Sequence, residues 1–313
     1  MNKPLASVCV VTYNHAKYIS ECLDSILAQE TNFIFEIIVS DDASTDNTVD
    51  ILREYEVNYP GIIRVINDGI NVGASENYRK AHRSAKGEYI AHCDGDDYWL
   101  PGKLQSQISF LEINADCSAV YSNAKVIDAN SSDYIGVFND KVRGKFDLNY
   151  LIESSNFLNN SSLVYRTVLR DEVIPLTEPS IDYMVHVNLC EHGLLGYLNE
   201  VLVVYRANVS GSIINQHANK VQFLVVDTIN SVWNKITNRS RNRIMGYFCG
   251  RAVLGLLQRN ESKYILYKKI KFGGGGYNKF NCKVLYHACI FIMHTFLLKI
   301  MKSDVLFPRI FKT

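Results

Sequence analysis

The sequence has no pair of cysteines at CxxC spacing, although it contains 8 cysteines in 313 residues. Most of these cysteines sit in apolar runs, where a free thiol behaves as a small hydrophobic side chain. A disulfide framework is therefore not indicated, and we expect reduced thiols and a cytosolic compartment. The content of hydrophobic residues, 47%, and of charged residues, 21%, is typical of a globular protein.

The sequence also lacks an apolar run long enough to cross a bilayer, which requires about 20 residues. The first apolar run, ASVCVV, is too short for the core of a signal peptide and is followed directly by TYNH. The most apolar stretch, residues 284–298, is interrupted by His287 and His294. We therefore expect surface association with a membrane rather than a spanning segment.

Acidic residues become scarce after Asn215, where 3 Asp and Glu stand against 17 Lys and Arg. Residues 216–313 thus carry a formal charge of +14 and the rest of the chain −13, which together give the net +1. We expect this basic region to be mostly helical, with a glycine hinge at residues 273–276. Its interleaved Phe, Leu and Ile favour an anionic membrane surface over nucleic acid, and a peripheral position on the inner face of the cell membrane. A solvated helical appendage and a dimerisation surface are the alternatives.

Short runs rich in apolar residues recur along the front of the chain and predict strands: Ser7–Thr12, Phe35–Ser40, Ile62–Asn67 and Glu88–Cys93. Between them, apolar residues at i, i+3, i+4 and i+7 predict helices, beginning with Ile19–Leu27. Further helices are expected around residues 49–55, 75–85 and 104–111. This alternation predicts an α/β fold with a mostly parallel, doubly wound sheet.

Polar clusters follow three of these strands: TYNH at residues 12–15, DDAS at 41–44 and DGDD at 94–97. In open parallel sheets the ligand site lies outside the carboxyl ends of the strands, so the three clusters are expected to converge. Ordinary turn and cap roles account for Ser44 and Thr45. They do not account for DGDD, because one cap needs one acid and crowded carboxylates repel each other. A cation among them would relieve that repulsion.

Five segments together resemble the inverting glycosyltransferases of family 2, which have the nucleotide-binding fold called GT-A. They are SVCVVTYNHAKYISECLDSIL, FEIIVSDDASTDNT, NVGASENYRKA, AKGEYIAHCDGDDYWLPGKL and YRANVSGS, and they cover roughly residues 5–210. The order and spacing of all five make the match specific. The resemblance is closest to bacterial enzymes that build capsule, O-antigen or other lipid-linked surface glycans.

The resemblance implies a GT-A domain over residues 1–215, with a nucleotide-sugar half near 1–115, an acceptor half near 116–215 and a helical extension at 216–313. It also implies that a sugar passes from a nucleotide sugar, with UDP the expected nucleotide, to a saccharide acceptor carried on polyprenyl diphosphate. A non-catalytic nucleotide-sugar-binding protein is the alternative. A sugar-1-phosphate nucleotidyltransferase is rejected, because it should carry a glycine-rich loop after the first strand and TYNHAKY has no glycine.

Three residues at the end of the first strand line the nucleotide pocket in enzymes of this family: Thr12, Tyr13 and Asn14. By the same resemblance Asp42 hydrogen-bonds the base, and a carboxylate can accept from the N3–H of uracil. The turn from Asn71 to Gly73 lets the backbone approach the nucleotide, for which glycine supplies clearance; a plain turn is the alternative. Arg206 is expected to pair with the diphosphate, or else to be an ordinary surface arginine.

The stretch Asp94-Gly95-Asp96 matches the DxD motif of the family. The resemblance makes Asp96 a ligand of Mn²⁺ or Mg²⁺, and it places Asp94 near the ribose and the water shell of the ion. Such hard cations bridge carboxylates and substrate phosphates rather than occupying an all-protein cage. The cation would act as a Lewis acid on the departing nucleoside diphosphate.

Inversion also needs a base, and a positioned carboxylate suits an oxocarbenium-like transition state. In this family the base precedes a late helix, and EPSIDYMVHVNLCEHG offers Asp182 there. The residue before it is Ile181, where many relatives carry Glu. Asp171 and Glu178 match less well, and the structural alternative for Asp182 is a helix N-cap.

Four residues are candidates for the acceptor side: Asp97, Trp99, Ser161 and Ser162. Asp97 either caps the next helix or orients the acceptor. Trp99 either packs against a sugar face or lies in the core beneath the next helix. The two serines belong to the segment Asn156–Arg166, which forms a strand and a loop near the acceptor in related enzymes.

Overall fold

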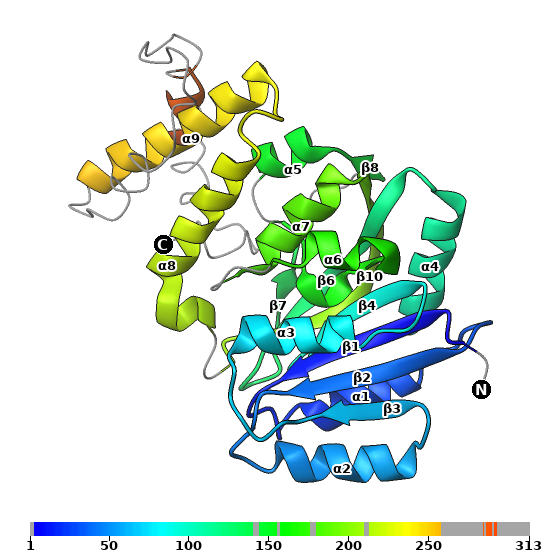
Figure 1. Ribbon diagram of the computed structural model, residues 1–313. Coiled ribbons are helices and arrows are strands. Elements are labelled where there is room, and N and C mark those ends of the chain that lie inside the picture. Colours follow the sequence, from blue (N-terminus) through cyan, green and yellow to red (C-terminus); the bar gives the residue numbers. More distant parts are fainter. Residues whose placement is uncertain are drawn as a thin grey trace. The chain divides into compact units, whose positions relative to one another are not determined.

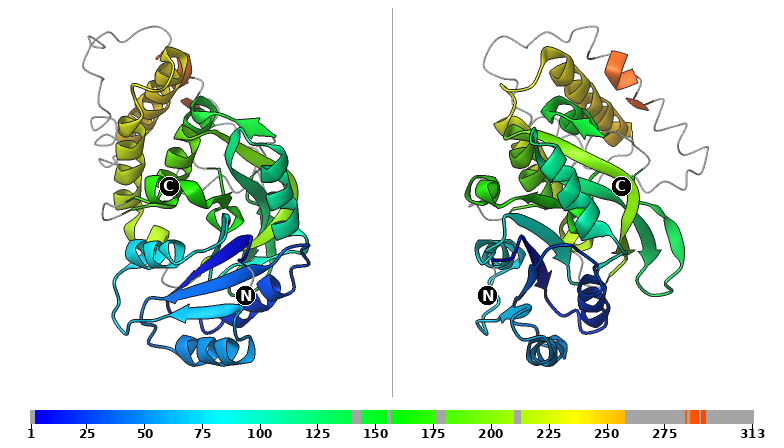
Figure 2. Two further views of the ribbon diagram at one scale, coloured as in Figure 1. Left: turned by 45° about the vertical axis from the view of Figure 1, so that its right-hand side comes forward. Right: turned by 90° about the vertical axis from the view of Figure 1, so that its right-hand side faces the viewer.

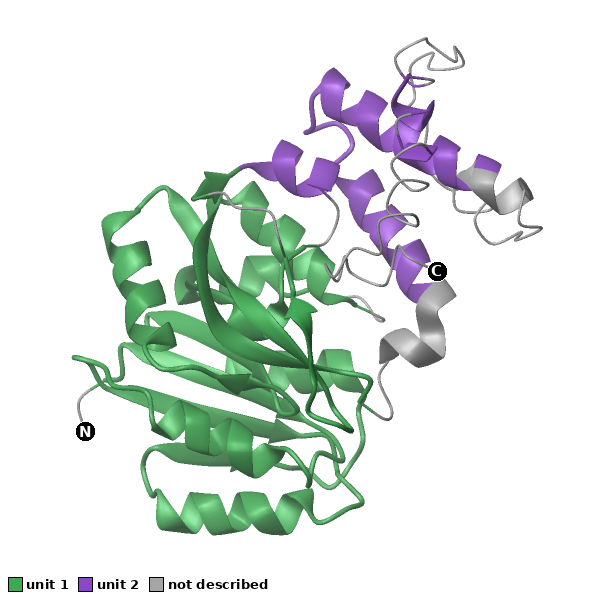
Figure 3. Cartoon of the chain, turned by 180° about the vertical axis from the view of Figure 1, so that it is seen from behind, with its two compact units in different colours: residues 1–146, 157–210 green, residues 147–156, 211–313 purple. Residues whose placement is uncertain are grey.

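The computed structural model describes residues 3–139, 144–154, 157–175, 180–209, 213–257, 284, 286–289 and 291–292 (Figure 1). The chain divides into two compact units (Figure 3). Unit 1 comprises residues 1–146 and 157–210, and unit 2 comprises residues 147–156 and 211–313. Residues 147–156, which the sequence placed in the acceptor half, thus group with the C-terminal region.

The front of unit 1 alternates strands and helices, as its apolar periodicity predicts. Its elements are β1 (Ala6–Thr12), α1 (Ile19–Leu27), β2 (Phe35–Asp41), α2 (Thr48–Asn58), β3 (Ile63–Ile66), α3 (Ala74–Arg83) and β4 (Tyr89–Asp94). The bounds of the four strands differ from the predicted ones by one residue at most. The sequence pattern is reliable here because β1, β2 and β4 are mostly buried on both faces.

The rest of unit 1 mixes short strands with helices. Its elements are β5 (Tyr98–Trp99), α4 (Lys103–Ile113), β6 (Cys117–Asp128), β7 (Tyr134–Val137), β8 (Lys145–Phe146), η1 (Asn160–Ser162), β9 (Val164–Arg166), η2 (Thr167–Leu169), α6 (Arg170–Val173), α7 (Asp182–Glu191) and β10 (Leu194–Ala207). The helix expected after Asp182 is therefore present.

A single sheet runs through unit 1 in the order β3-β2-β1-β4-β9-β6-β10-β5. Strands β3, β2, β1 and β4 are parallel to one another, and β10 is parallel to β6. Strand β9 lies antiparallel between β4 and β6, and β5 pairs antiparallel with β10. The predicted parallel α/β sheet is confirmed, with antiparallel strands added on the side of β4 away from β1.

Helices cover both faces of the front sheet (Figure 2). Val8 and Val10 of β1 belong to the same core cluster as Ile19 and Leu23 of α1. The intervening Cys9 points the other way, and its Sγ donates a hydrogen bond to the carbonyl of Ala81 in α3, at 3.4 Å. Because successive side chains of a strand face opposite sides, α1 and α3 lie on opposite faces of β1. This is the doubly wound arrangement that the sequence predicts.

Unit 2 is helical where it is described, with α5 (Leu148–Ser154), α8 (Ile213–Ser231) and α9 (Asn238–Leu257). Ser240 of α9 lies 2.7 Å from the carboxylate of Glu153 in α5, and Arg243 forms an ion pair with the same carboxylate. None of the described helices has the length and apolar character needed to cross a bilayer. The predicted hinge at residues 273–276 and most of the basic residues behind it lie outside the described residues.

Candidate functional site

The carboxyl ends of β1, β2 and β4 meet at one edge of the sheet. Thr12 pairs with Asp41 in the register of β1 and β2, and Val11 pairs with Asp94 in that of β1 and β4. The backbone N–H of Gly95 donates to the carbonyl of Val11, at 2.8 Å. The predicted convergence of the three polar clusters is therefore confirmed.

Asp42 holds the turn that carries Asn71 and Gly73. Its Oδ1 accepts the backbone N–H of Val72 at 2.7 Å, and its Oδ2 accepts that of Gly73 at 3.0 Å. The side chain of Asn71 donates in return to the carbonyl of Asp42, at 3.0 Å. With 4% of its surface exposed, Asp42 is a buried anchor for this turn.

Gly73 has a φ of +86°, and a Cβ added there would meet nothing within 4 Å. The need for glycine at this position is thus conformational, since L side chains are strained at such a φ. The open space beside Gly73 leaves its expected role, clearance for an approaching nucleotide, as a prediction.

Asn14 joins the end of β1 to the loop that follows β2. Its side-chain oxygen accepts the backbone N–H of Thr45 at 2.7 Å, and its own N–H donates to the hydroxyl of Ser44 at 2.8 Å. Asn14 has a φ of +56°, which asparagine tolerates better than most residues. The side chain of the neighbouring Tyr13 makes no hydrogen bond with another described residue, and 43% of the Tyr13 surface is exposed.

Gly95 packs tightly against the loop after β1. An added Cβ would lie 2.9 Å from Cβ of Thr12 and 3.1 Å from Nδ1 of His15. The hydroxyl of Thr12 and Nδ1 of His15 are both buried and find no hydrogen-bond partner among the described residues. Buried polar atoms of this kind need a partner, so this loop offers two groups to a bound molecule or water beside the DxD segment.

Asp94 is held from one side. Its Oδ1 lies 3.0 Å from Nε2 of His92, and its Oδ2 lies 3.3 Å from the hydroxyl of Ser161. Burial alone would raise the pKa of Asp94, but the contacts with His92, His15 and Ser161 outweigh it, and the pKa falls below its ordinary value. Asp94 is therefore ionised at neutral pH, with 37% of its side chain exposed.

Asp96 differs from its neighbours, because no other described residue donates a hydrogen bond to its carboxylate. Burial raises the pKa of this group above its ordinary value; Asp94 adds to the rise, and His15 opposes it. A carboxylate without partners next to a second carboxylate is stabilised by a nearby cation.

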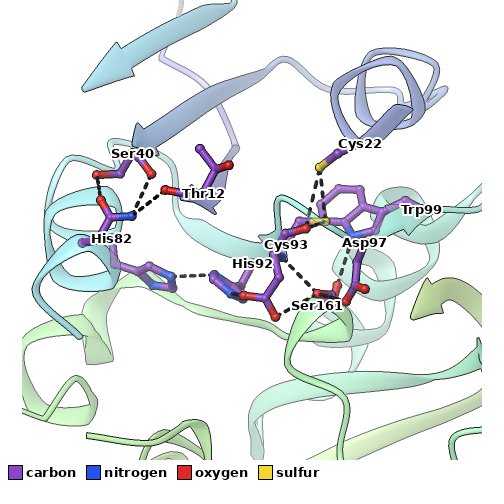
Figure 4. Close-up of polar contacts among 11 residues, drawn as sticks. Thr12, Cys22, Ser40, His82, His92, Cys93, Asp97, Trp99 and Ser161 are labelled. Carbon is purple, nitrogen blue, oxygen red and sulfur yellow. Dashed lines mark hydrogen bonds and ion pairs between the residues drawn. The ribbon is translucent and has the colours of Figure 1, made fainter. Parts of the chain in front are cut away.

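Asp97 is buried, with 1% of its surface exposed. Its Oδ2 lies 2.6 Å from the hydroxyl of Ser161 (Figure 4). Its Oδ1 accepts the backbone N–H of Arg206 at 3.0 Å. Burial raises the pKa of Asp97 well above its ordinary value, and Asp96 and Asp94 raise it further. Helix α4 has Gly102 at its N-cap and no side-chain cap, so Asp97 does not cap that helix. Instead it ties the DGDD segment to η1 and β10.

Trp99, Ser161 and Ser162 lie inside unit 1. The indole N–H of Trp99 donates to the carbonyl of Ser161 at 3.0 Å, and 2% of the Trp99 surface is exposed. The hydroxyl of Ser162 donates to the carbonyl of Asn159, at 2.7 Å. Both serines have no exposed surface. Of the two roles weighed for Trp99, the structure gives core packing, and Ser161 supports the DGDD segment through Asp94 and Asp97.

Arg206 is also an internal residue, with 7% of its surface exposed. One terminal nitrogen donates to the carbonyl of Asp96 at 2.5 Å, and the other forms an ion pair with Glu21 of α1. The guanidinium lies over the rings of Tyr18 and Tyr98, at 5.0 and 4.8 Å. These contacts exclude the alternative of an ordinary surface arginine: one terminal nitrogen holds the backbone of Asp96, and the other pairs with the Glu21 side chain of α1. Pairing of Arg206 with the diphosphate stays a prediction.

Asp182 begins α7, one position after the N-cap Ile181. Its side chain accepts the backbone N–H of Tyr183 at 2.8 Å, and it is not itself the N-cap. Burial raises the pKa of the Tyr205 phenol, and the charges of Asp97, Asp96, Asp94 and Asp182 raise it further. Asp182 and the three DGDD carboxylates therefore all act electrostatically on this one phenol. Asp171 is exposed and paired with Arg170, while Glu178 lies outside the described residues.

The oxygen donors at this edge fit a hard divalent cation shared with a substrate. Asp96 and the second oxygen of Asp94 are carboxylates, which Mg²⁺ and Mn²⁺ prefer. No group of three His, Cys, Asp or Glu among the described residues is arranged to hold a metal by itself. Such a pair of carboxylates is what a cation needs when phosphate oxygens complete its coordination.

Four contributors were not found from the sequence. His92 contacts Asp94, His15 lies against Gly95, and Glu21 pairs with Arg206, which holds the backbone of Asp96. Lys103 is buried, with Nζ 3.8 Å from the ring of Trp99. His15 had a signal, because it ends the TYNH cluster. Glu21 and Lys103 lie in helices and His92 lies inside a strand. Their spacing in the sequence does not reveal these contacts.

Comparison with known proteins agrees with this geometry. The family model "Glycosyl transferase family 2" matches residues 7–166. The uncharacterized protein Rv1520 of Mycobacterium tuberculosis is 34% identical over 209 residues, which cover 66% of this chain and 59% of that protein. The chain thus spans less than two thirds of the length of this relative.

Two further proteins are similar over more of their length. The Escherichia coli enzyme WfaP, a UDP-Glc:alpha-D-GlcNAc-diphosphoundecaprenol beta-1,3-glucosyltransferase, is 28% identical over 248 residues, covering 78% of this chain and 91% of WfaP. The structure of S. aureus TarS 1–349 in complex with UDP-GlcNAc has a TM-score of 0.62 and 18% identity, covering 96% of this chain and 87% of TarS. That similarity shows the fold, and the GT-A expectation is confirmed. Because the family model matches residues 7–166 of 313, this chain belongs to glycosyltransferase family 2.

Proposed function

We propose that this protein transfers a hexose from a UDP-sugar to a lipid-linked saccharide, with inversion at the anomeric carbon, in the synthesis of a surface polysaccharide. The name of WfaP gives UDP-Glc as its donor and a diphosphoundecaprenol-linked GlcNAc as its acceptor. TarS has been crystallised with UDP-GlcNAc. Both support a uridine nucleotide as donor, and WfaP supports the lipid carrier.

The observation that carries this proposal is the pair of carboxylates, Asp94 and Asp96, at the edge where β1, β2 and β4 end. A further carboxylate, Asp182, begins α7. Inverting transfer needs a negatively charged leaving group held on one side of the sugar and a proton acceptor on the other. The DGDD segment and the separate carboxylate of Asp182 would supply these two parts.

In the proposed reaction an acceptor hydroxyl attacks the anomeric carbon as its proton passes to Asp182. A new C–O bond forms, the bond from the anomeric carbon to the diphosphate oxygen breaks, and UDP leaves with the electron pair. Asp42 keeps the turn at Asn71–Gly73 in place for the nucleotide, and Arg206 fixes the backbone that carries Asp96. A divalent cation held by Asp96 and Asp94 would neutralise the departing diphosphate.

The basic region of residues 216–313 would bring the enzyme to its acceptor. Its formal charge of +14 supports attraction to an anionic membrane surface, worth about 1 kcal/mol for each well-placed Lys or Arg. A polyprenyl-linked acceptor is held at such a surface, so this role fits the proposed substrate.

A donor panel with an Asp182→Asn variant tests the function. Purified protein is incubated with UDP-, GDP- and dTDP-sugars, Mn²⁺ and GlcNAc-diphosphoundecaprenol, and both nucleotide release and glycolipid product are measured. We expect turnover with a UDP-sugar, a roughly 10²–10⁴-fold lower rate for Asp182→Asn, and unchanged UDP binding by calorimetry. Asp171→Asn is the matched control, because this exposed carboxylate pairs with Arg170 and should keep full activity.

One outcome would contradict the transfer function, and another would contradict the assignment of Asp182 as the base. Tight binding of a nucleotide sugar without turnover under any condition would favour the non-catalytic binding protein. Wild-type rates in Asp182→Asn would remove Asp182 as the base and leave the transfer activity intact.

A further inference from the structure

A buried hydrogen-bonded chain of four side chains ends on the DxD segment. Tyr165 of β9 lies 2.9 Å from Nδ1 of His82 in α3, and Nε2 of His82 lies 3.1 Å from Nδ1 of His92 in β4. Nε2 of His92 lies 3.0 Å from Oδ1 of Asp94. Tyr165, His82 and His92 have no exposed surface. Figure 4 shows the imidazoles of His82 and His92 joined by a dashed line.

The chemistry of the four groups gives the chain one direction. An ionised carboxylate can only accept, so Nε2 of His92 carries hydrogen and donates to Asp94. In neutral His92 the other nitrogen then accepts, which requires a hydrogen on Nε2 of His82. Nδ1 of His82 accepts in turn, and the Tyr165 hydroxyl donates to it. All four ring nitrogens have a partner in this arrangement and in no other that keeps both imidazoles neutral and Asp94 ionised.

The rings around His82 keep it in place. The ring of Tyr78 stacks on His82 with centroids 3.8 Å apart, and the ring of Tyr165 stacks at 5.8 Å. Burial lowers the pKa of His82 well below its ordinary value, and His92 lowers it further, so His82 is neutral. Neither the imidazole of His82 nor that of His92 can turn without leaving a buried nitrogen without a hydrogen-bond partner, which is costly.

The second oxygen of Asp94 remains open to a ligand. Its neighbour is the hydroxyl of Ser161 at 3.3 Å, but that hydroxyl has a single hydrogen and a closer acceptor in Asp97, at 2.6 Å. Asp94 is thus fixed through Oδ1, and its Oδ2 is left without a strong donor among the described residues.

We propose that His92 is a positioning residue for Asp94, and that His82 and Tyr165 fix the tautomer of His92 that allows it to act. By holding Oδ1, His92 presents Oδ2 to the donor nucleotide and its cation. This inference rests on the proposed function, in which Asp94 binds the donor. Partners that hold a ligating group in this way change cation affinity when they are removed, even though they touch no ligand.

The first test measures the affinity for Mn²⁺ in the presence of UDP, from the free Mn²⁺ signal in electron paramagnetic resonance. His92→Met keeps the volume but removes the donor, and we expect it to weaken Mn²⁺ binding roughly 10–100-fold. His92→Gln places an amide N–H near the position of Nε2 and should restore most of the affinity. His186→Met is the matched control, because His186 is equally buried and its ring nitrogens have no hydrogen-bond partner among the described residues.

The second test needs neither ligand nor activity. The ¹⁵N shifts of the two imidazoles should show hydrogen on Nε2 of both His82 and His92. Tyr165→Phe removes only the terminal hydroxyl and should give a mixture of His82 tautomers. A hydrogen on Nδ1 of His92 would overturn the proposed direction of the chain.

The outcomes separate this inference from the function on which it rests. A folded His92→Met protein that binds Mn²⁺ and UDP as the wild type does would refute the positioning role alone. A wild-type protein that binds neither would refute the proposed function, and the positioning role with it. Equal losses in His92→Met, His92→Gln and His186→Met would show a general effect of disturbing the core and would also refute it.

Discussion

The buried amine of Lys103 leads to a testable prediction about the stability of the protein and its dependence on pH. The side chain has no exposed surface, and its Nζ finds no hydrogen-bond partner among the described residues. Burial lowers its pKa from 10.5 to about 7. The ring of Trp99, 3.8 Å from Nζ, works in the opposite direction by favouring the charged form.

The size of the effect follows from these two contributions. A fall from 10.5 to about 7 costs roughly 5 kcal/mol of stability while the amine is charged, at about 1.4 kcal/mol per pH unit. A desolvated cation–π contact returns about 2 kcal/mol. Replacing Lys103 by Met, which keeps the length and removes the charge, should therefore stabilise unit 1 by about 3 kcal/mol at pH 6.

The sign of the pH dependence is fixed by linkage. Between about pH 7 and 10.5 the unfolded chain binds a proton at Lys103 that the folded protein has released. Stability of the wild type therefore rises with pH through this window, and the advantage of Lys103→Met shrinks as it does.

Urea unfolding from pH 6 to pH 9.5, followed by Trp99 fluorescence in a Trp233→Phe background, measures this difference. Lys125→Met is the control, because Lys125 also lies over a ring, that of Tyr134 at 5.7 Å, but is exposed to solvent. A Lys103→Met variant that is less stable than the wild type at pH 6, or a difference that does not change with pH, would refute the reasoning.

Two further predictions concern the site itself. Asp96→Ala should abolish transfer without lowering the unfolding free energy, because the carboxylate accepts no hydrogen bond from another described residue; EDTA should abolish wild-type activity as well, and full activity in EDTA would exclude a catalytic cation. Asp42→Ala should raise KM for the donor more than it lowers kcat, and it should speed hydrogen exchange at the backbone amides of Val72 and Gly73, which lose their acceptors. An unchanged KM with a large loss of kcat, or unchanged exchange at these amides, would show that Asp42 does not act by holding the turn.

The front sheet could be predicted because its information is local. Apolar spacing at Ile19, Cys22 and Leu23 specifies α1, and those residues have no exposed surface. The parallel order then brings Thr12, Asp41 and Asp94 to one edge without any knowledge of side-chain contacts. Strand β9 could not be predicted as a central strand, because Val164–Arg166 is three residues long and its place between β4 and β6 depends on partners far along the chain.

The roles of the site residues were harder to predict than their positions. Ser161 and Trp99 looked like residues for an acceptor, yet their hydrogen bonds with Asp94, Asp97 and each other lie inside the fold. His82 and His92 gave no signal, because a histidine within an apolar strand or an amphipathic helix has no spacing that reveals its partner. Such pairings join residues from different elements, and only the packing of those elements specifies them.

The structure explains the three neighbouring carboxylates of DGDD differently from the sequence, which suggested one shared cation. The three carboxylates do not share one task. Asp97 accepts hydrogen bonds from the Ser161 hydroxyl and from the backbone N–H of Arg206, and burial raises its pKa. Asp94 uses one of its two oxygens, Oδ1, for a hydrogen bond with His92. Among the described residues, Asp96 and the second oxygen of Asp94 remain for a cation and a diphosphate. One buried acid thus orders the segment, while the other two can face a cation bound with the substrate.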